Sequence, residues 1–234
     1  MFLEKDRILF IAIYFITKMR HLSLKTPCRI NKSDLLFRIA QYLLVNGSFI
    51  NSLGLLTGKM GIVIFFCHYS RHANNAVYEE FAGELLDEIY EEIHNETPIS
   101  FADGLCGIAW GILHLIENGF VDADPDEVLS DIDQAIMKYD VRKITDTSLS
   151  SGLLGVAHYV FRRKNIDSGY LQELTENMEF QNLKKPDLNS LLKEMVENIE
   201  INEDLFELEN PLLGIENGIV GIGLKLIWAN NEQL

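Results

Sequence analysis

Two kinds of hydrophobic pattern alternate along this chain. Residues 58–69 are apolar nearly all round, as the run from Ile62 to Phe66 illustrates, and a helix of that kind is buried on several sides. Residues 78–94 carry a single apolar stripe among acidic side chains, at Phe81, Leu85, Ile89 and Ile93. Such a stripe predicts an outer helix with one solvated face.

The alternation continues through the rest of the chain and predicts a wholly helical protein. Helices are expected at 6–20, 35–46, 58–69, 78–94, 104–117, 124–139, 152–163, 168–178, 188–199 and 218–228. In the helix that starts near 124, Asp124 is the expected N-cap, Pro125 occupies the first turn and Glu127 completes a capping box.

A short glycine motif opens four of these helices. Gly-x-x-Gly followed by an aliphatic residue starts at residues 58, 104, 152 and 218, so successive copies lie 46, 48 and 66 residues apart. A recurring unit of two helices indicates a repeat of helical hairpins. We expect the polar residue before each first glycine to cap its helix: Thr57, Asp103, Ser151 and Asn217. Both glycines would then lie in the first turn, where the missing Cβ atoms let neighbouring helix ends approach closely.

The alternation of fully apolar and amphipathic helices implies two layers. Inner helices would be enclosed on all sides, and outer helices would be exposed on one. Closing such hairpins around an axis gives an α/α toroid, whereas leaving them open gives a solenoid. The nearly all-apolar inner helices favour a toroid, complete or partial. No clear linker divides the sequence, so we expect one all-α domain over residues 1–234.

Composition narrows the possible partners and the compartment. The net charge is −15, from 35 acidic and 20 basic residues, which disfavours nucleic acid because phosphate binding needs a basic surface. The charge suits a basic peptide. Cys28, Cys67 and Cys106 are too few and too scattered for a disulfide framework, and they fit a reducing compartment such as the cytoplasm.

The N-terminal stretch contains an apolar run of the kind found in targeting segments. Its apolar part, Ile8 to Ile16, is shorter than the roughly 20 residues of a membrane span. The charges before it are mixed, and no small-x-small cleavage site follows. We expect a buried helix and no membrane span, with a signal segment as the alternative.

The glycine repeats resemble those of the lanthionine synthetase C-like (LanC-like) family. The likeness is carried by Gly104-Leu105-Cys106-Gly107-Ile108-Ala109-Trp110-Gly111 and by the stretch from Gly214 to Gly223, and it covers about residues 35 to 230. The resemblance implies an α/α toroid with the glycine-bearing helices inside. Cyclases of that family bind zinc and join a peptide cysteine to a dehydrated Ser or Thr, since the metal lowers the pKa of the thiol.

The sequence departs from the family pattern where the zinc ligands belong. The family cysteines lie two residues before a Gly-x-x-Gly, and a ligand His follows one of them. The matching positions here are Leu56, Ala102, Ser150 and Glu216. A catalytic zinc site needs about three protein ligands, so no cofactor is expected at these positions.

Other residues could still hold zinc. Cys106 lies in the first turn of a helix, where a thiolate is favoured, and His114 and His158 lie on inner helices; together these three are the candidate zinc ligands. His68 and His72 are four residues apart on one helix and could share a metal. The preferred interpretation is that both lie at the C-terminus of that helix, where a histidine interacts favourably with the helix dipole.

One mouth of the toroid is the expected place for chemistry. Asp103, His158 and Glu216 are the candidate catalytic residues there, because loops at one end of a scaffold carry function. Asp103 and Glu216 could also act as the carboxylate pair of a sugar-cleaving toroid.

Three hypotheses for function follow. The first is a LanC-like protein without catalytic zinc that binds a peptide or protein partner in peptide modification. The second is an active zinc-dependent thioether cyclase with another ligand set. The third is a carbohydrate-active α/α toroid.

Overall fold

The computed structural model describes residues 31–94, 96–187, 190–201 and 211–231. Within these ranges the regular structure is helical and includes no β-strand, which confirms the all-α prediction. The helix expected at 6–20 lies outside the described residues. No helix in the described ranges has the length and apolar character needed to cross a membrane.

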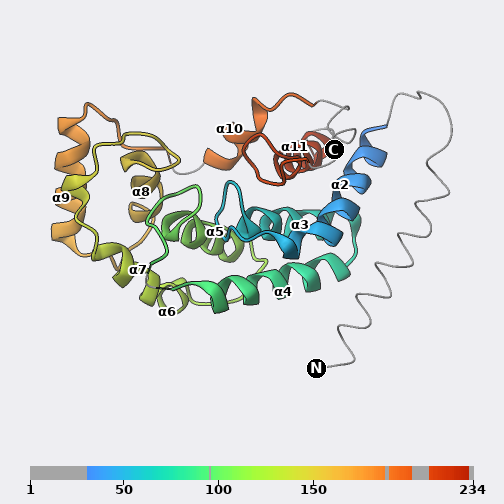
Figure 1. Ribbon diagram of the computed structural model, residues 1–234, viewed down its shortest axis with the longest axis horizontal. Coiled ribbons are helices and arrows are strands. Elements are labelled where there is room, and N and C mark those ends of the chain that lie inside the picture. The colour runs from blue at the N-terminus through green and yellow to red at the C-terminus, as the bar shows by residue number, and fades with distance from the viewer. Residues whose placement is uncertain (1–30, 95, 188–189, 202–210, 232–234) are drawn as a thin grey trace.

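The helices follow the expected order, with several shifted ends (Figure 1). Their bounds are α2 Lys32–Asn46, η1 Gly47–Phe49, α3 Lys59–Ala73, α4 Val77–Glu92, α5 Leu105–Glu117, α6 Pro125–Val128, α7 Ser130–Met137, η2 Val141–Lys143, α8 Leu153–Val160, α9 Ser168–Phe180, α10 Leu191–Glu197 and α11 Ile219–Asn231. The single helix expected at 124–139 is divided into α6 and α7 at Leu129. The Asp124 side chain caps α6 as expected, because its Oδ1 accepts from the Asp126 N–H at 2.9 Å.

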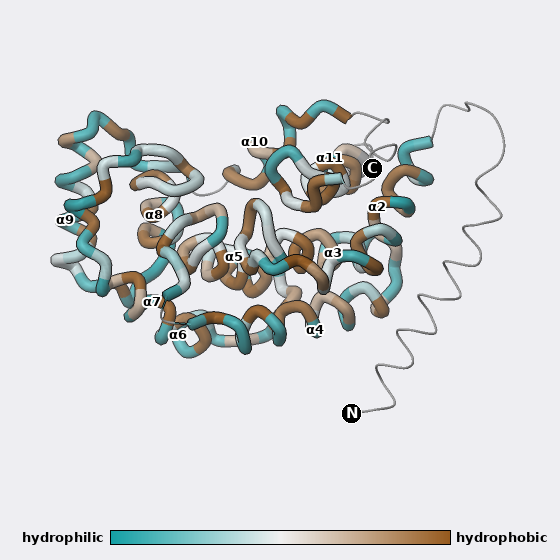
Figure 2. Tube along the Cα trace, viewed as in Figure 1, coloured by the Kyte–Doolittle hydropathy of each residue, from teal (hydrophilic) through white to brown (hydrophobic). Residues whose placement is uncertain are grey.

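The two predicted layers are present. The glycine-bearing helices α3, α5, α8 and α11 form the buried layer, and their apolar residues make most of one continuous core. Figure 2 shows the inner helix α5 largely brown, whereas the outer helices α4 and α9 mix brown with teal. α4 packs on α3, α7 on α5, and α9 on α8, while α2 packs on α11. Each outer helix therefore covers an inner one.

The inner helices lie side by side in the order α11, α3, α5, α8. Backbone hydrogen bonds join the loops before them: Ile215 N–H donates to Leu56 O at 2.7 Å, Leu56 N–H to Ala102 O at 2.9 Å, and Ala102 N–H to Ser150 O at 2.8 Å. The fourth glycine repeat is thus the neighbour of the first. A toroid likewise brings its last repeat back beside its first.

The arc is interrupted between α8 and α11. Within the described residues, no backbone hydrogen bond of this kind joins their two preceding loops. α10 occupies the interval and packs on α11 (Figure 1). Ile199, just after α10, contacts the place where a Cβ of Gly221 would stand, at 2.5 Å. We call this interval the seam. The third and fourth glycine pairs are 66 residues apart in the sequence, and this longer connection includes α10.

The expected side-chain caps are wrong for the first three inner helices. The first glycine of each pair is itself the N-cap, and the helix begins one residue later, so Thr57, Asp103 and Ser151 precede the cap. The free N–H groups bond to the preceding loop instead, for example Lys59 N–H to Ser52 O and Leu105 N–H to Pro98 O, at 2.9 and 2.8 Å. The fourth repeat does the same, from Ile219 N–H to Leu212 O at 2.9 Å.

The glycines make room for that loop. A Cβ on the first glycine of a pair would stand within 2.4 Å of a loop carbonyl oxygen, as at Gly58 against Ser52 O. A Cβ on the second would also meet the loop, as at Gly107, 1.9 Å from Phe101 O. The close approach is therefore mainly between a helix and its own preceding loop, and only secondarily between neighbouring repeats.

Candidate functional site

The loops before the inner helices form the expected mouth, and Asp103 lies on one of them. Its carboxylate is exposed and accepts hydrogen bonds from the Thr57 hydroxyl and from Ser52 Oγ, the latter at 3.2 Å. These residues line a cleft of about 400 Å³ that also includes Glu92 and His94. Asp103 thus links two neighbouring loops on the outer side of the mouth.

Glu216 lines a different cleft, at the seam. This cleft has a volume of about 680 Å³ and is bounded by the loops before α8 and α11 and by the end of α10. Its lining combines apolar and polar side chains: Leu149, Met195, Asn198, Ile199, Glu200, Ile215, Glu216, Asn217 and Ile222. Because Asp103 is not part of it, the structure does not bring the two carboxylates together around one cleft.

His158 lies on α8 and is only 8% exposed. Its Nδ1 atom has no hydrogen-bond partner, and its ring packs near Phe101, with ring centroids 6.1 Å apart. Burial lowers the pKa of His158 to about 4, with help from the positive charge of Arg162. It lines neither the Asp103 cleft nor the seam cleft.

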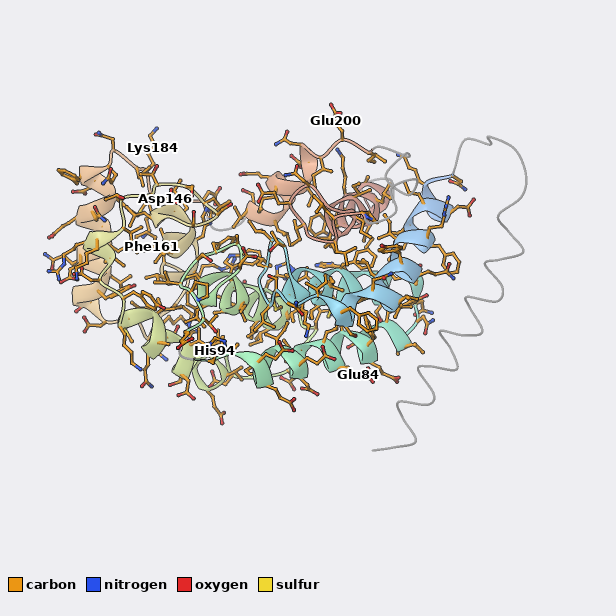
Figure 3. All side chains as sticks on the ribbon, in the orientation of Figure 1. Glu84, His94, Asp146, Phe161, Lys184 and Glu200 are labelled. Atoms are coloured by element: carbon orange, nitrogen blue, oxygen red, sulfur yellow. The ribbon has the colours of Figure 1, made fainter. Side chains whose placement is uncertain are left out.

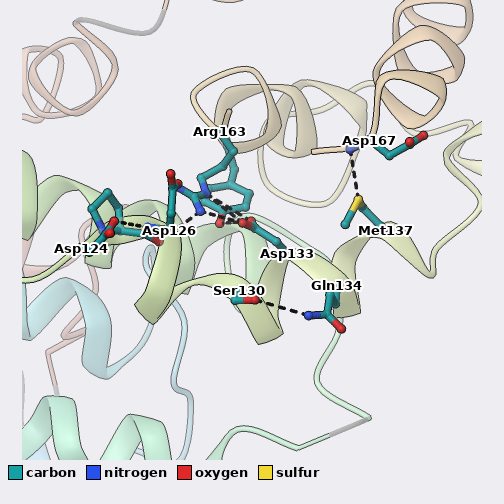
Figure 4. A network of polar contacts seen from close by, with 10 residues as sticks. Asp124, Asp126, Ser130, Asp133, Gln134, Met137, Arg163 and Asp167 are labelled. Carbon is teal, nitrogen blue, oxygen red and sulfur yellow. Dashed lines mark hydrogen bonds and ion pairs between the residues drawn. The ribbon is translucent and has the colours of Figure 1, made fainter. Parts of the chain in front are cut away.

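Cys106 is fully buried on α5, where burial raises the pKa of its thiol well above the usual value. The expectation of a favoured thiolate at this helix start is therefore wrong. The thiol lies near a buried network on the outer side of α5. In this network Arg163 pairs with Asp133 at 2.8 Å (Figure 4), and Tyr159 Oη donates to Asp133 at 2.5 Å. Cys106, His114 and His158 do not form a cluster.

Two histidines meet near the C-terminal ends of the inner helices α3 and α5. His68 on α3 and His114 on α5 face each other, and their Nε2 atoms are 3.1 Å apart. Trp110 stacks on His114 at 5.4 Å, and Trp228 meets the His68 ring edge-on at 5.4 Å. We call these two histidines the His pair. They border a cleft of about 400 Å³ that Arg162 and the start of α10 also line.

Both imidazoles of the His pair are held neutral. Burial lowers the pKa of His68 to about 4, and the charge of Arg71 adds to the effect. Burial lowers the pKa of His114 to about 3, with smaller effects from His68 and Arg162. One ring nitrogen therefore donates a hydrogen bond and the other accepts it.

Sequence reasoning missed this pair although the signal was present. His68 follows Gly61 by seven residues, and His114 follows Gly107 by seven, so the two hold equivalent positions in neighbouring repeats. The spacing of four residues between His68 and His72 on one helix predicts a different pair. His72 is exposed and its ring stacks on Tyr69, with centroids 6.3 Å apart.

The positions that match the family zinc ligands do not fit a zinc ion. Leu56 and Ala102 have apolar side chains, and they serve the fold through the backbone bonds that link the loops. Ser150 offers a hydroxyl, so Glu216 is the one strong ligand of the four. Among the described residues, no group of three or more His, Cys, Asp or Glu side chains could hold a metal.

The chain matches a known protein family. A family model described as lanthionine synthetase C-like protein matches residues 50–231, which is most of the chain and includes all four glycine pairs. No curated protein and no solved structure matches the chain significantly. The chain belongs to the lanthionine synthetase C-like family.

Proposed function

We propose that this LanC-like protein binds a basic peptide segment, from a peptide or protein partner in peptide modification, in the seam cleft. The observation that carries the proposal is the cleft itself. It has about 680 Å³ of space, an apolar part at Leu149, Ile215 and Ile222, and carboxylates at Glu200 and Glu216. A cleft with an apolar floor and a few placed polar groups is the usual form of a binding site.

Charge favours a basic occupant. Glu200 and Glu216 are both exposed, and Figure 3 shows Glu200 extending outward at the edge of the molecule. The chain as a whole carries a net charge of −15. Such a field attracts cationic peptides and raises their association rate, and salt weakens the attraction.

The donor atoms support binding without zinc-dependent cyclisation. Three of the four positions that match the family ligands hold Leu56, Ala102 and Ser150, which supply no imidazole, thiolate or carboxylate. Leu56, Ala102 and Ser150 link the loops through backbone hydrogen bonds. Glu216, which lines the seam cleft, is the residue of the four that would contact the peptide. An active thioether cyclase with another ligand set is the competing function.

Fluorescence anisotropy with labelled peptides of varied charge tests the proposal. We expect basic peptides to bind, with affinity that falls as salt rises, and Glu216→Lys to weaken binding about tenfold. Glu84→Lys is the matched control, because Glu84 lies on α4, away from Glu200 (Figure 3), and the substitution makes the same charge change.

Two outcomes would contradict the proposal. Equal losses in both variants would mean that only the net charge matters. Conversion of a dehydrated, cysteine-containing peptide to a thioether, detected by loss of its free thiol, would establish the cyclase instead.

A further inference from the structure

The His pair has the geometry of two ligands that share one metal ion. A zinc–nitrogen bond is about 2.0–2.1 Å, so two imidazole nitrogens on a tetrahedral ion lie about 3.3 Å apart. The Nε2 atoms of His68 and His114 are 3.1 Å apart and their ring centroids 5.4 Å apart, so the two rings face each other nearly end to end. To admit an ion, the nitrogens must separate by a few tenths of an ångström and both rings must turn until their lone pairs meet at one point. The helices that carry them, α3 and α5, are neighbours in the arc and keep the two rings within reach of one ion.

We propose that His68 and His114 together bind one divalent transition-metal ion that prefers imidazole, such as Zn²⁺, Ni²⁺ or Cu²⁺, with water completing its coordination. The site is independent of the proposed peptide cleft. It lies at the opposite end of the inner helices from Leu56, Ala102 and Glu216, and the adjoining cleft of about 400 Å³ has room for the waters.

The surroundings supply the conditions that such an ion needs. Imidazole binds a metal only when it is neutral, which suits rings enclosed by aromatic side chains. Phe120 and Trp228 lie beside His68, and Trp110 stacks on His114. His114 lies in the last turn of α5, where the helix dipole favours positive charge. The cations Arg162 and Lys193 line the adjoining cleft and oppose a metal, and Glu117 pairs with Arg162 and offsets one of these charges.

One proton must move for both Nε2 atoms to face the metal. Asn118 Nδ2 lies 3.3 Å from His114 Nδ1 and 2.8 Å from the His114 carbonyl oxygen, so it is placed to donate to Nδ1. That contact favours the tautomer with its proton on Nε2. Metal binding would shift the proton to Nδ1 and break the longer Asn118 contact.

The chain contains a built-in optical probe for this site. Its two tryptophans are Trp110 and Trp228, and both pack against the His pair. Titration of metal-free, untagged protein with Ni²⁺ or Cu²⁺ should therefore quench the tryptophan fluorescence with a stoichiometry of one. Calorimetry with Zn²⁺ should give the same stoichiometry.

Substitutions separate this site from adventitious binding. We expect His68→Asn and His114→Asn each to weaken binding at least about tenfold. His72→Asn is the matched control, since His72 lies one turn away on the same helix and is exposed. Asn118→Ala should tighten binding, because it removes the contact that holds the proton on Nε2. Circular dichroism confirms that each variant is folded.

Several results would overturn the proposal. These are the absence of saturable binding up to about 1 mM metal, unchanged affinity in either His-pair variant, or an equal loss in His72→Asn. Weaker binding in Asn118→Ala would also count against coordination through Nε2.

Discussion

At the scale of single residues, the second glycine of each pair is required by the loop that precedes its helix. The Phe101 carbonyl oxygen occupies the space where a Cβ of Gly107 would stand, at 1.9 Å. The contact is with backbone, which cannot rotate away as a side chain can. Gly83, in the middle of α4, has no neighbour within 4 Å of its missing Cβ. A side chain would therefore be excluded at Gly107 but has space at Gly83.

We expect Gly107→Ala to destabilise the protein by about 3 kcal/mol or more, because the loop must move. Gly83→Ala should stabilise it by about 0.5–1 kcal/mol, because alanine is the better helix former. Urea denaturation followed by circular dichroism measures both. Similar effects of the two substitutions would mean that the loop is not fixed against α5.

The buried His158 predicts a pH dependence of stability. Its pKa is about 4 in the folded protein, below the usual value of 6.5, so the unfolded chain binds its proton first as pH falls. Its contribution is complete above about pH 6.5 and is lost as pH falls towards 4, at no more than about 1.4 kcal/mol per pH unit. His158→Phe should reduce the slope of unfolding free energy against pH in that window. His94→Phe, at an exposed site, serves as the control.

At the scale of elements, a buried lysine joins an inner helix to its outer partner. Lys59, in the first turn of α3, is 3% exposed and pairs with Glu88 and Glu92 of α4 at 2.9 and 2.8 Å. Desolvation lowers the pKa of Lys59, but the hydrogen bonds to Glu92 and Glu88 outweigh it, so the pKa is raised. The ammonium group therefore stays charged and depends on both carboxylates.

Removing both carboxylates should be worse than removing the lysine. We expect Glu88→Gln with Glu92→Gln to destabilise by about 1–2 kcal/mol, because a buried charge is left unpaired, with the loss reduced by solvent at the glutamates. Lys59→Met should stay within about 1 kcal/mol of the parent, since it replaces the charge with an apolar chain. Thermal unfolding of the two variants decides the order, and the reverse order would contradict this account.

The spacing of apolar residues was sufficient to predict the helices and their two layers. A helix buried on all sides is apolar all round, and a helix buried on one side has a single apolar stripe, so the local sequence distinguishes the two. The ring order was harder, since contacts between Ile215 and Leu56 are set by backbone atoms that every residue has. For the same reason the sequence predicts Thr57 as the cap, whereas Gly58 holds that position. The His pair was within reach, because His68 and His114 are equivalent in the repeat, but pairing them required knowing that α3 and α5 are neighbours.

At the scale of the whole molecule, the order of the inner helices in space differs from their order in the chain. α3, α5 and α8 are successive glycine helices in the chain, whereas α11 joins the far side of α3. α10 then fills the interval that remains, with its start near the His pair and its end at the seam cleft. A single short helix therefore borders both proposed sites, although each is tested separately.

The closure of α11 on α3 has a consequence for biosynthesis. α11 begins at residue 219 and α3 at residue 59, so the wall of α3 that α11 covers leaves the ribosome 160 residues before its partner. At about 5–20 residues per second, Phe65 of α3, which would lie 2.4 Å from a Cβ on Gly223, is synthesised on the order of 10 to 30 s before that helix. During that interval the nascent chain presents an apolar face of the kind that chaperones bind, and translation that stops before α11 leaves the face permanently exposed.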